Sequence, residues 1–209
     1  MSQSKLSRIK FIYEKNGFKG IINQILLKLK INFQLRDDSG KKKYFFSNFV
    51  SREYNYKIQS GHFKGLYLKN NLNIELLSNK LENLYETEVI NEIIELQSKF
   101  KKKYFVNLGC SDGFYLIGLL GKNIFPYSIC FDLNKKSINA CKKNLNHNKI
   151  SADRYTLFNE KFNDNSFQFF DNNKIDLKDC LFLIDIEGDE INFLSLKNIE
   201  KLKNSILIV

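Results

Sequence analysis

The chain has little proline, no tryptophan and no long apolar run. Its 209 residues contain a single proline, Pro126, and only two histidines. No stretch approaches the roughly 18 apolar residues of a membrane span, and the first residues are too polar to open a signal peptide. The four cysteines lack the CxxC or histidine-rich spacing of a zinc site, so they are expected neither to bind zinc nor to form a disulfide framework. These absences predict a cytoplasmic protein with buried, reduced thiols.

The chain does contain enough apolar material for a folded core. Hydrophobic residues make up 43% of the sequence, and 19 residues are phenylalanine. This can fill one mid-sized domain and an accessory segment. The net charge of +10 is unevenly distributed, because residues 1–60 carry 13 Lys and Arg against 4 Asp and Glu. The remaining residues, 61–209, carry 20 against 19, so the basic surplus is N-terminal.

An amphipathic helix pattern lies in this basic segment, over residues 18–30. Its apolar face consists of Phe18, Ile21, Ile22, Ile25, Leu26 and Leu29. One interpretation is that this face docks on the following domain or on a second subunit, giving a homo-oligomer. The other is peripheral contact with an anionic surface, such as the inner membrane, as basic amphipathic helices make. Nucleic-acid binding is not favoured, because the segment contains no recognisable recognition module.

Composition and pattern divide the chain into three parts. Residues 1–60 form the basic helical segment and a polar linker, RDDSGKKK, at Arg36 to Lys43. Residues 61–103 form a hairpin and a lead-in helix, and residues 104–209 form an α/β domain.

Two patterns predict the structure of the N-terminal extension of this domain. Residues 54–69 alternate as two short strands around a turn at Ser60 to Gly65, which indicates a β-hairpin. Apolar residues at helical spacing from Leu77 to Phe100 predict a helix with a kink near Tyr85 to Thr87.

From Tyr104 onward, short apolar runs alternate with helical patterns. Strands are expected at 104–108, 127–132, 154–159, 181–186 and 205–209, and helices near 113–121, 135–146 and 189–202. Continuous apolar strands such as LFLID are typical of a parallel sheet that is covered on both faces. We therefore predict a Rossmann-like, doubly wound α/β fold with a mostly parallel sheet.

The last expected strand, SILIV, stops at Val209. An apolar strand at a sheet edge is normally covered or charged. We therefore expect that the sheet is truncated after its fifth strand. An alternative is that the N-terminal segment or another subunit covers this strand.

Two glycines follow the first strand, at the place where nucleotide sites of α/β folds begin. In FVNLGCSDGFYLIGLLG, Gly109 lets the backbone turn and Gly113 lets the next helix approach a ligand. Asp132, 23 residues after Gly109, ends the next apolar run and is placed to hold ribose hydroxyls. The glycine places of G-x-G-x-x-G are taken by Gly109, Ser111 and Phe114. This pattern favours S-adenosylmethionine, which has no phosphate, over a nicotinamide cofactor.

A cluster of acids follows the fourth expected strand. In LFLIDIEGDEINFL, Asp185 ends the strand, and Glu187, Asp189 and Glu190 surround Gly188. Such a rim could attract a sulfonium, orient a hydroxyl, accept its proton or bind a metal together with other oxygen ligands. Alternatively, Asp189 and Glu190 are acids that favour the dipole of a helix amino terminus.

Together these motifs resemble the FkbM-type branch of class I S-adenosylmethionine-dependent methyltransferases. Its D-x-E-G-x-E segment is matched by Asp185, Glu187, Gly188 and Glu190, and LYETEV at 84–89 is similar to its lead-in segment. The resemblance covers roughly residues 80–209. It implies a class I methyltransferase fold and transfer of a methyl group to an oxygen of a sugar or another small polar acceptor, as in polysaccharide biosynthesis.

The resemblance also implies roles for individual residues. The methionine portion of S-adenosylmethionine would be surrounded by Asn107, Gly109, Cys110, Ser111 and Gly113. Asp132 would hold the ribose and Glu160 would lie near adenine, while Asp185 and then Glu187 are the candidate catalytic acids. The chain departs from the family at Asn107, where an acid commonly stands.

Further candidates for acceptor contact are His62, in SGHFKG, Glu86, in LYETEV, and Glu190. Methylation of nucleobases is not expected, because the chain has no D/N-P-P-Y/F and no Pro-Cys motif. Two alternatives remain open. One is a nicotinamide-dependent oxidoreductase. The other is a non-catalytic membrane or assembly module that keeps the fold without the cofactor, which Asn107 and the basic helix suggest.

Overall fold

The computed structural model describes residues 39–186, 188 and 190–209. The amphipathic helix expected over residues 18–30 lies outside these residues, so its docking and membrane interpretations stay predictions. In chain order the elements are α2 (Ser39–Glu53), α3 (Ile74–Glu82), α4 (Thr87–Phe100), β1 (Tyr104–Leu108), α5 (Phe114–Gly121), β2 (Tyr127–Phe131), α6 (Lys135–His147), the short helix η1 (Ala152–Arg154), β3 (Tyr155–Phe158), α7 (Asp164–Asn172), the short helix η2 (Leu177–Asp179), β4 (Cys180–Ile184), α8 (Glu190–Phe193), α9 (Leu196–Leu202) and β5 (Ile206–Ile208). In this part of the chain, no helix combines the length and the apolar character that crossing a membrane requires.

All five expected strands are present, and they form one parallel sheet in the order β3-β2-β1-β4-β5. This confirms the Rossmann-like, doubly wound α/β fold. The chain places β2 and β3 on one side of β1 and then β4 and β5 on its other side. The strand order therefore reverses between β1 and β4. Ligands of open α/β sheets bind at this reversal, outside the carboxyl ends of the strands.

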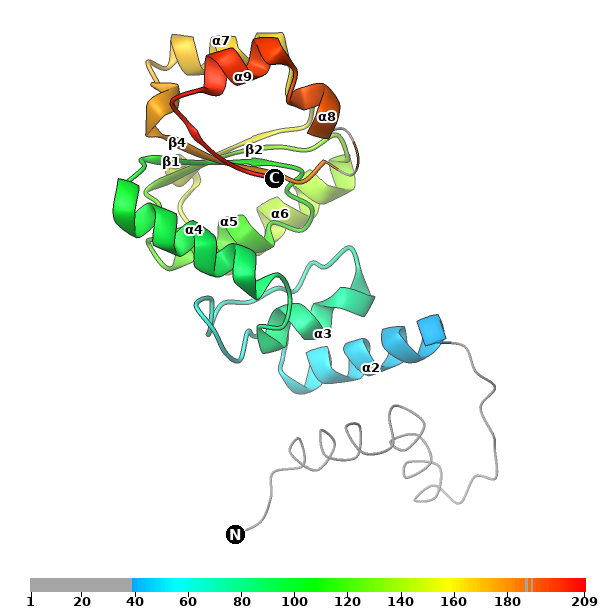
Figure 1. The fold of residues 1–209 in the computed structure, drawn as a ribbon. Coiled ribbons are helices and arrows are strands. Elements are labelled where there is room, and N and C mark those ends of the chain that lie inside the picture. The colour runs from blue at the N-terminus through cyan, green and yellow to red at the C-terminus, as the bar shows by residue number, and fades with distance from the viewer. Residues whose placement is uncertain (1–38, 187, 189) are drawn as a thin grey trace, which may run out of the picture.

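Helices cover both faces of the sheet. The helices α4, α5 and α6 lie on one face, and α7 and α9 lie on the other (Figure 1). Successive residues of β1 therefore enter different cores. Phe105 packs in the core under α4, α5 and α6, the first helical layer, and Val106 packs in the core under α7 and α9, the second layer. Both are fully buried. This arrangement explains why the strands are continuously apolar instead of alternating.

The N-terminal extension, which in the structure is residues 39–86, packs on the first helical layer. Its helices α2 and α3 contact each other beside α4, α5 and α6 (Figure 1). Leu77 and Leu81 of α3 are fully buried in the same core as α5. Phe63 lies so close to Gly118 of α5 that a Cβ added there would be 2.3 Å from its ring. These apolar contacts hold the extension against α5.

Three expectations for the extension are corrected. The linker expected at Arg36 to Lys43 is wrong from Ser39 onward, because α2 begins there. The hairpin reduces to one isolated antiparallel bridge, between Lys57 and Tyr67. The kinked helix is two helices, because Asn83 ends α3 in the left-handed conformation that asparagine tolerates.

Two differences occur in the C-terminal half. The helix α7 is not among the predicted elements. It begins with a reciprocal cap, in which the Asn163 N–H donates to Ser166 Oγ at 3.0 Å and Asn163 Oδ1 accepts from the Asn165 N–H at 2.8 Å. The helix expected over 189–202 is divided into α8 and α9. In the described sheet β5 is an edge strand, and its coverage by further strands or segments stays a prediction.

Candidate functional site

The site lies where three neighbouring strands end. Leu108, the last residue of β1, pairs with Phe131 of β2 and with Ile184 of β4. The following residues are therefore Gly109 in the middle, Asp132 on one side and Asp185 on the other. Because the strands are parallel, both carboxylates lie at the same edge of the sheet, beside the glycine turn.

A cleft of about 770 Å³ opens at this edge. Its size lies within the range of small-molecule sites. The lining residues are Leu72, Asn73, Leu76, Lys80, Tyr85, Leu108, Gly109, Ser111, Phe131, Asp132, Leu133, Asn134, Ser137, Glu160, Lys161, Phe162, Asp185, Ile186, Phe193 and Asn198. Five of the expected site residues are thus brought together: Gly109, Ser111, Asp132, Glu160 and Asp185. A smaller hollow of about 490 Å³ lies beside α7, at the amino-terminal end of β4, away from these groups.

Gly109 is required by the close approach of β4. Its φ is +87°, and an added Cβ would lie 1.8 Å from the carbonyl oxygen of Asp185. Gly113 is required for a different reason from the one expected. Its φ is +81°, and an added Cβ would lie 2.5 Å from Cys141 Sγ of α6. Gly113 therefore permits helix packing, and it is not among the residues that line the cleft.

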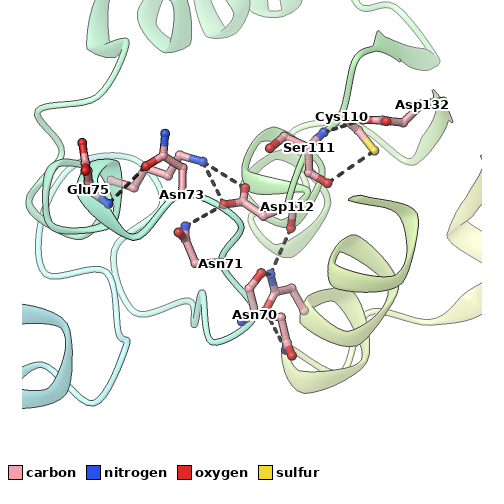
Figure 2. A network of polar contacts seen from close by, with 10 residues as sticks. Asn70, Asn71, Asn73, Glu75, Cys110, Ser111, Asp112 and Asp132 are labelled. Atoms are coloured by element: carbon pink, nitrogen blue, oxygen red, sulfur yellow. Dashed lines mark hydrogen bonds and ion pairs between the residues drawn. The ribbon is translucent and has the colours of Figure 1, made fainter. Parts of the chain in front are cut away.

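The carboxylate of Asp132 is held by two backbone donors. The Ser111 N–H donates to Oδ2 at 3.0 Å (Figure 2), and the Asn134 N–H donates to Oδ1 at 2.8 Å. A carboxylate has about four acceptor positions, so two remain for a ligand. Two hydroxyl groups on neighbouring carbons, as in ribose, match this remaining capacity.

Two of the expected cofactor contacts, Asn107 and Cys110, are buried behind the turn and do not line the cleft. Within the described structure, Nδ2 of Asn107 has no hydrogen-bond partner. The Cys110 thiol contacts those of Cys130 and Cys141, and hydrogen bonds from these two thiols lower the pKa of Cys110 to about 6. All four cysteines of the chain are buried, as expected.

Two acids of the loop after β4 have different surroundings. Asp185 is exposed and lines the cleft. Glu190 holds the loop, because its Oε1 accepts from the N–H groups of Ile186 at 3.1 Å and Gly188 at 3.2 Å. Glu187 lies outside the described residues.

The two remaining candidates are not in the cleft lining. Glu86 accepts a hydrogen bond from the Tyr115 hydroxyl and also bonds Tyr85, whose ring does line the cleft. Burial, followed by these bonds to Glu86, raises the pKa of both tyrosines. His62 lies on an exposed turn, where its Nε2 is 3.1 Å from Oδ1 of Asn91 on α4.

One wall of the cleft was missed by sequence reasoning. It consists of residues from the N-terminal extension: Leu72, Asn73, Leu76, Lys80 and Tyr85. One feature of the sequence could have indicated this wall. Lys80 follows Leu77 by three residues, which places a lysine on the apolar face of a helix.

No protein-family model and no curated protein matches the chain. Among solved structures, the chain is similar to the O-methyltransferase from Bacillus cereus in complex with SAH, with 13% identity and a TM-score of 0.43 over 88% of this chain and 67% of that one. It is also similar to a cofactor-bound protein from MTB, with 12% identity and a TM-score of 0.43 over 88% and 67% of the two chains. At these identities and TM-scores, activity does not transfer to this chain, so we infer it from the chain's own residues.

Proposed function

We propose that this chain is an O-methyltransferase that uses S-adenosylmethionine and acts on a hydroxyl group of a sugar or another small polar acceptor. The observation that carries the proposal is the position of Asp132 and Asp185 on either side of Gly109, in one cleft. The resemblance to FkbM-type methyltransferases agrees with it. A role in polysaccharide biosynthesis is part of the same proposal.

The cleft residues fit S-adenosylmethionine. Asp132 binds the ribose hydroxyls, since its carboxylate is fixed and still has acceptor capacity. Glu160 and the neighbouring apolar side chains of Leu133 and Phe162 receive the adenine. The turn from Gly109 to Ser111 contacts the methionine portion. Asn107, Cys110 and Gly113 act from behind by fixing the shape of this turn.

The charge of the cleft favours this donor over a dinucleotide. Three acids line it, Asp132, Glu160 and Asp185. The lysines that line it are Lys80 and Lys161, and the ion pair of Lys80 with Asp112 adds no net charge. A pyrophosphate would be repelled by such a surface, whereas a cationic sulfonium is attracted. A nicotinamide-dependent oxidoreductase is therefore the second candidate function.

Asp185 is the proposed catalytic acid. S-adenosylmethionine supplies an electrophilic methyl group on a positively charged sulfur. The Asp185 carboxylate accepts a hydrogen bond from the acceptor hydroxyl and orients its oxygen. It would take the hydroxyl proton as the methyl–sulfur bond breaks, the methyl–oxygen bond forms and S-adenosylhomocysteine leaves. Glu187 is proposed as a second acid on the same loop. Glu190 supports this loop through its backbone hydrogen bonds.

The wall from the N-terminal extension supports a sugar acceptor. It presents the ring of Tyr85 and the aliphatic side chains of Leu72 and Leu76 to the cleft that Asp185 and Asp132 also line. A sugar offers an apolar C–H face to such a ring and hydroxyl groups to the acids. Glu86 contributes by orienting Tyr85, and the proposal assigns His62 no contact with the acceptor.

Calorimetric titration of the full chain with S-adenosylhomocysteine tests the proposal. We expect binding at one site, and we expect Asp132→Asn to weaken it about tenfold or more, because charge-assisted hydrogen bonds to the ribose are lost. Asp153→Asn is the matched control, since Asp153 is an exposed aspartate outside the cleft. A folded chain that binds NAD and not S-adenosylhomocysteine would reverse the ranking. A folded chain that binds neither, but sediments with liposomes, would indicate a non-catalytic module.

A further inference from the structure

Lys80 is a buried charged residue that lines the cleft from the N-terminal extension. It lies on α3, and only 6% of its side chain is exposed. Its Nζ atom is 3.0 Å from Oδ1 and 2.9 Å from Oδ2 of Asp112, which is buried in the turn between β1 and α5. Lys80 lines the cleft and Asp112 does not, so the positive member of the pair is the one placed toward the ligand.

Asparagine residues hold Asp112 independently of Lys80 (Figure 2). Asn71 Nδ2 donates to Oδ2 of Asp112 at 2.7 Å, and Asn144 Nδ2 donates to its backbone oxygen at 3.0 Å. Asn144 is itself fixed, because its Oδ1 accepts from the N–H of Asn70 at 2.8 Å. The turn that carries Asp112 is therefore anchored without the lysine.

The ammonium group of Lys80 has capacity for a further partner. An ammonium carries three donor protons. In the described part of the chain, the hydrogen bonds found for Nζ are those to the two oxygens of Asp112, so at least one proton remains. The rings of Tyr85 and Phe114 lie beside Nζ, with centroids 4.9 and 5.5 Å away, and stabilise the desolvated charge.

The position of Lys80 indicates which ligand group it meets. Ser111 donates to Asp132, and the next residue of the turn, Asp112, pairs with Lys80. The turn thus connects the carboxylate proposed to hold ribose with a buried cation. A donor whose ribose is held at Asp132 and whose tail follows the turn brings the end of that tail to Lys80.

We propose that Lys80 binds the carboxylate at the amino-acid end of the methyl donor. This inference rests on the proposed function and assigns one subsite within it. An anionic group of the acceptor has the same chemistry, so the test measures binding of the donor product in the absence of any acceptor.

The test compares S-adenosylhomocysteine with its decarboxylated analogue, which keeps the amino group and lacks the carboxylate. We expect the full wild-type chain to prefer S-adenosylhomocysteine by about 10- to 100-fold, the range of a charge-assisted hydrogen bond. Lys80→Met should bind the two compounds within about threefold of each other. Lys69→Met is the matched control, because Lys69 is exposed and outside the cleft, and it should keep the preference.

Two further variants separate ligand binding from a structural role of the pair. Lys80→Met leaves Asp112 buried without its cation, which destabilises proteins. The double variant Lys80→Met with Asp112→Asn removes both charges and should fold and lack the preference. Asp112→Asn alone keeps the lysine and should keep the preference. If the ion pair had only a structural role, Asp112→Asn and Lys80→Met would lose the preference for S-adenosylhomocysteine to the same extent.

Each result is decisive. Equal binding of the two compounds by the wild-type chain, or a preference that persists in a folded double variant, overturns the subsite while leaving the proposed function standing. Failure of the folded wild-type chain to bind S-adenosylhomocysteine at all overturns the proposed function, and the subsite with it.

Discussion

Replacing Gly109 with alanine should disrupt the site and lower the free energy of unfolding by more than its backbone conformation alone requires. The residue has a φ of +87°, which an L-residue adopts at a cost of about 1–2 kcal/mol. The added Cβ would also lie 1.8 Å from the Asp185 carbonyl oxygen, so β1 and β4 must separate at their carboxyl ends. This separation weakens the hydrogen bond from the Asp185 N–H to the Leu108 oxygen, which contributes about 0.5–1.5 kcal/mol. We therefore expect a total loss of about 1.5–3.5 kcal/mol.

The control for this variant is Gly65→Ala. Gly65 has a similar φ of +93°, but the nearest atom to an added Cβ is the end of the Lys57 side chain, 4.0 Å away. Only the conformational cost of about 1–2 kcal/mol applies there. Urea unfolding should be followed by circular dichroism, because the chain has no tryptophan. Affinity for S-adenosylhomocysteine should fall in Gly109→Ala and persist in Gly65→Ala. Equal stability of the two variants would refute the steric reasoning.

Three more predictions concern Asp185, the tyrosines with raised pKa values and the buried cysteines. Asp185→Asn should bind S-adenosylhomocysteine as the wild type does and lose about 100- to 10,000-fold in methyl-transfer rate, and a fully active variant would exclude Asp185 as the base. Burial raises the pKa of Tyr54, Tyr85 and Tyr115 above 10.0, so their contribution to stability is present below pH 10 and is lost at higher pH. In an alkaline titration followed by tyrosinate absorbance, these three tyrosines should ionise only as the chain unfolds. Ionisation of all 10 tyrosines while the chain is still folded would contradict the prediction. The four buried thiols should react with a bulky reagent only after denaturation, and rapid reaction of one equivalent with the native chain would show that one is exposed.

The α/β domain could be predicted because its strands carry their own signal. Each is a short apolar run bounded by polar or glycine residues, and burial on both faces makes the run continuous. Once the sheet is parallel, the carboxyl ends of its strands share one edge, so Asp132 and Asp185 could be expected to lie close together. The helix α7 was missed because its signal is a short cap and two buried phenylalanines, Phe167 and Phe170, in a polar segment.

The rest of the site depends on contacts between residues distant in sequence. Lys80 and Asp112 are 32 residues apart, and no local pattern relates them. Gly113 was recognised as a required glycine, but the atom that requires it belongs to Cys141 on another helix. The bounds of the N-terminal elements were also less predictable, because left-handed residues such as Asn83 end helices without proline or glycine.

The two walls of the cleft come from different parts of the chain, and this division bears on how the site is organised. The strand ends supply Asp132 and Asp185, whose positions follow from backbone pairing within the sheet. The opposite wall consists of side chains from 72 to 85, which the sheet does not position. The pair of Lys80 and Asp112 joins the walls, since one residue lies on α3 and the other in the turn after β1. The donor site that we propose therefore spans both walls, with Asp132 from the sheet and Lys80 from α3. The rest of the wall from 72 to 85 can differ in sequence without loss of donor binding only where the pair of Lys80 and Asp112 is retained.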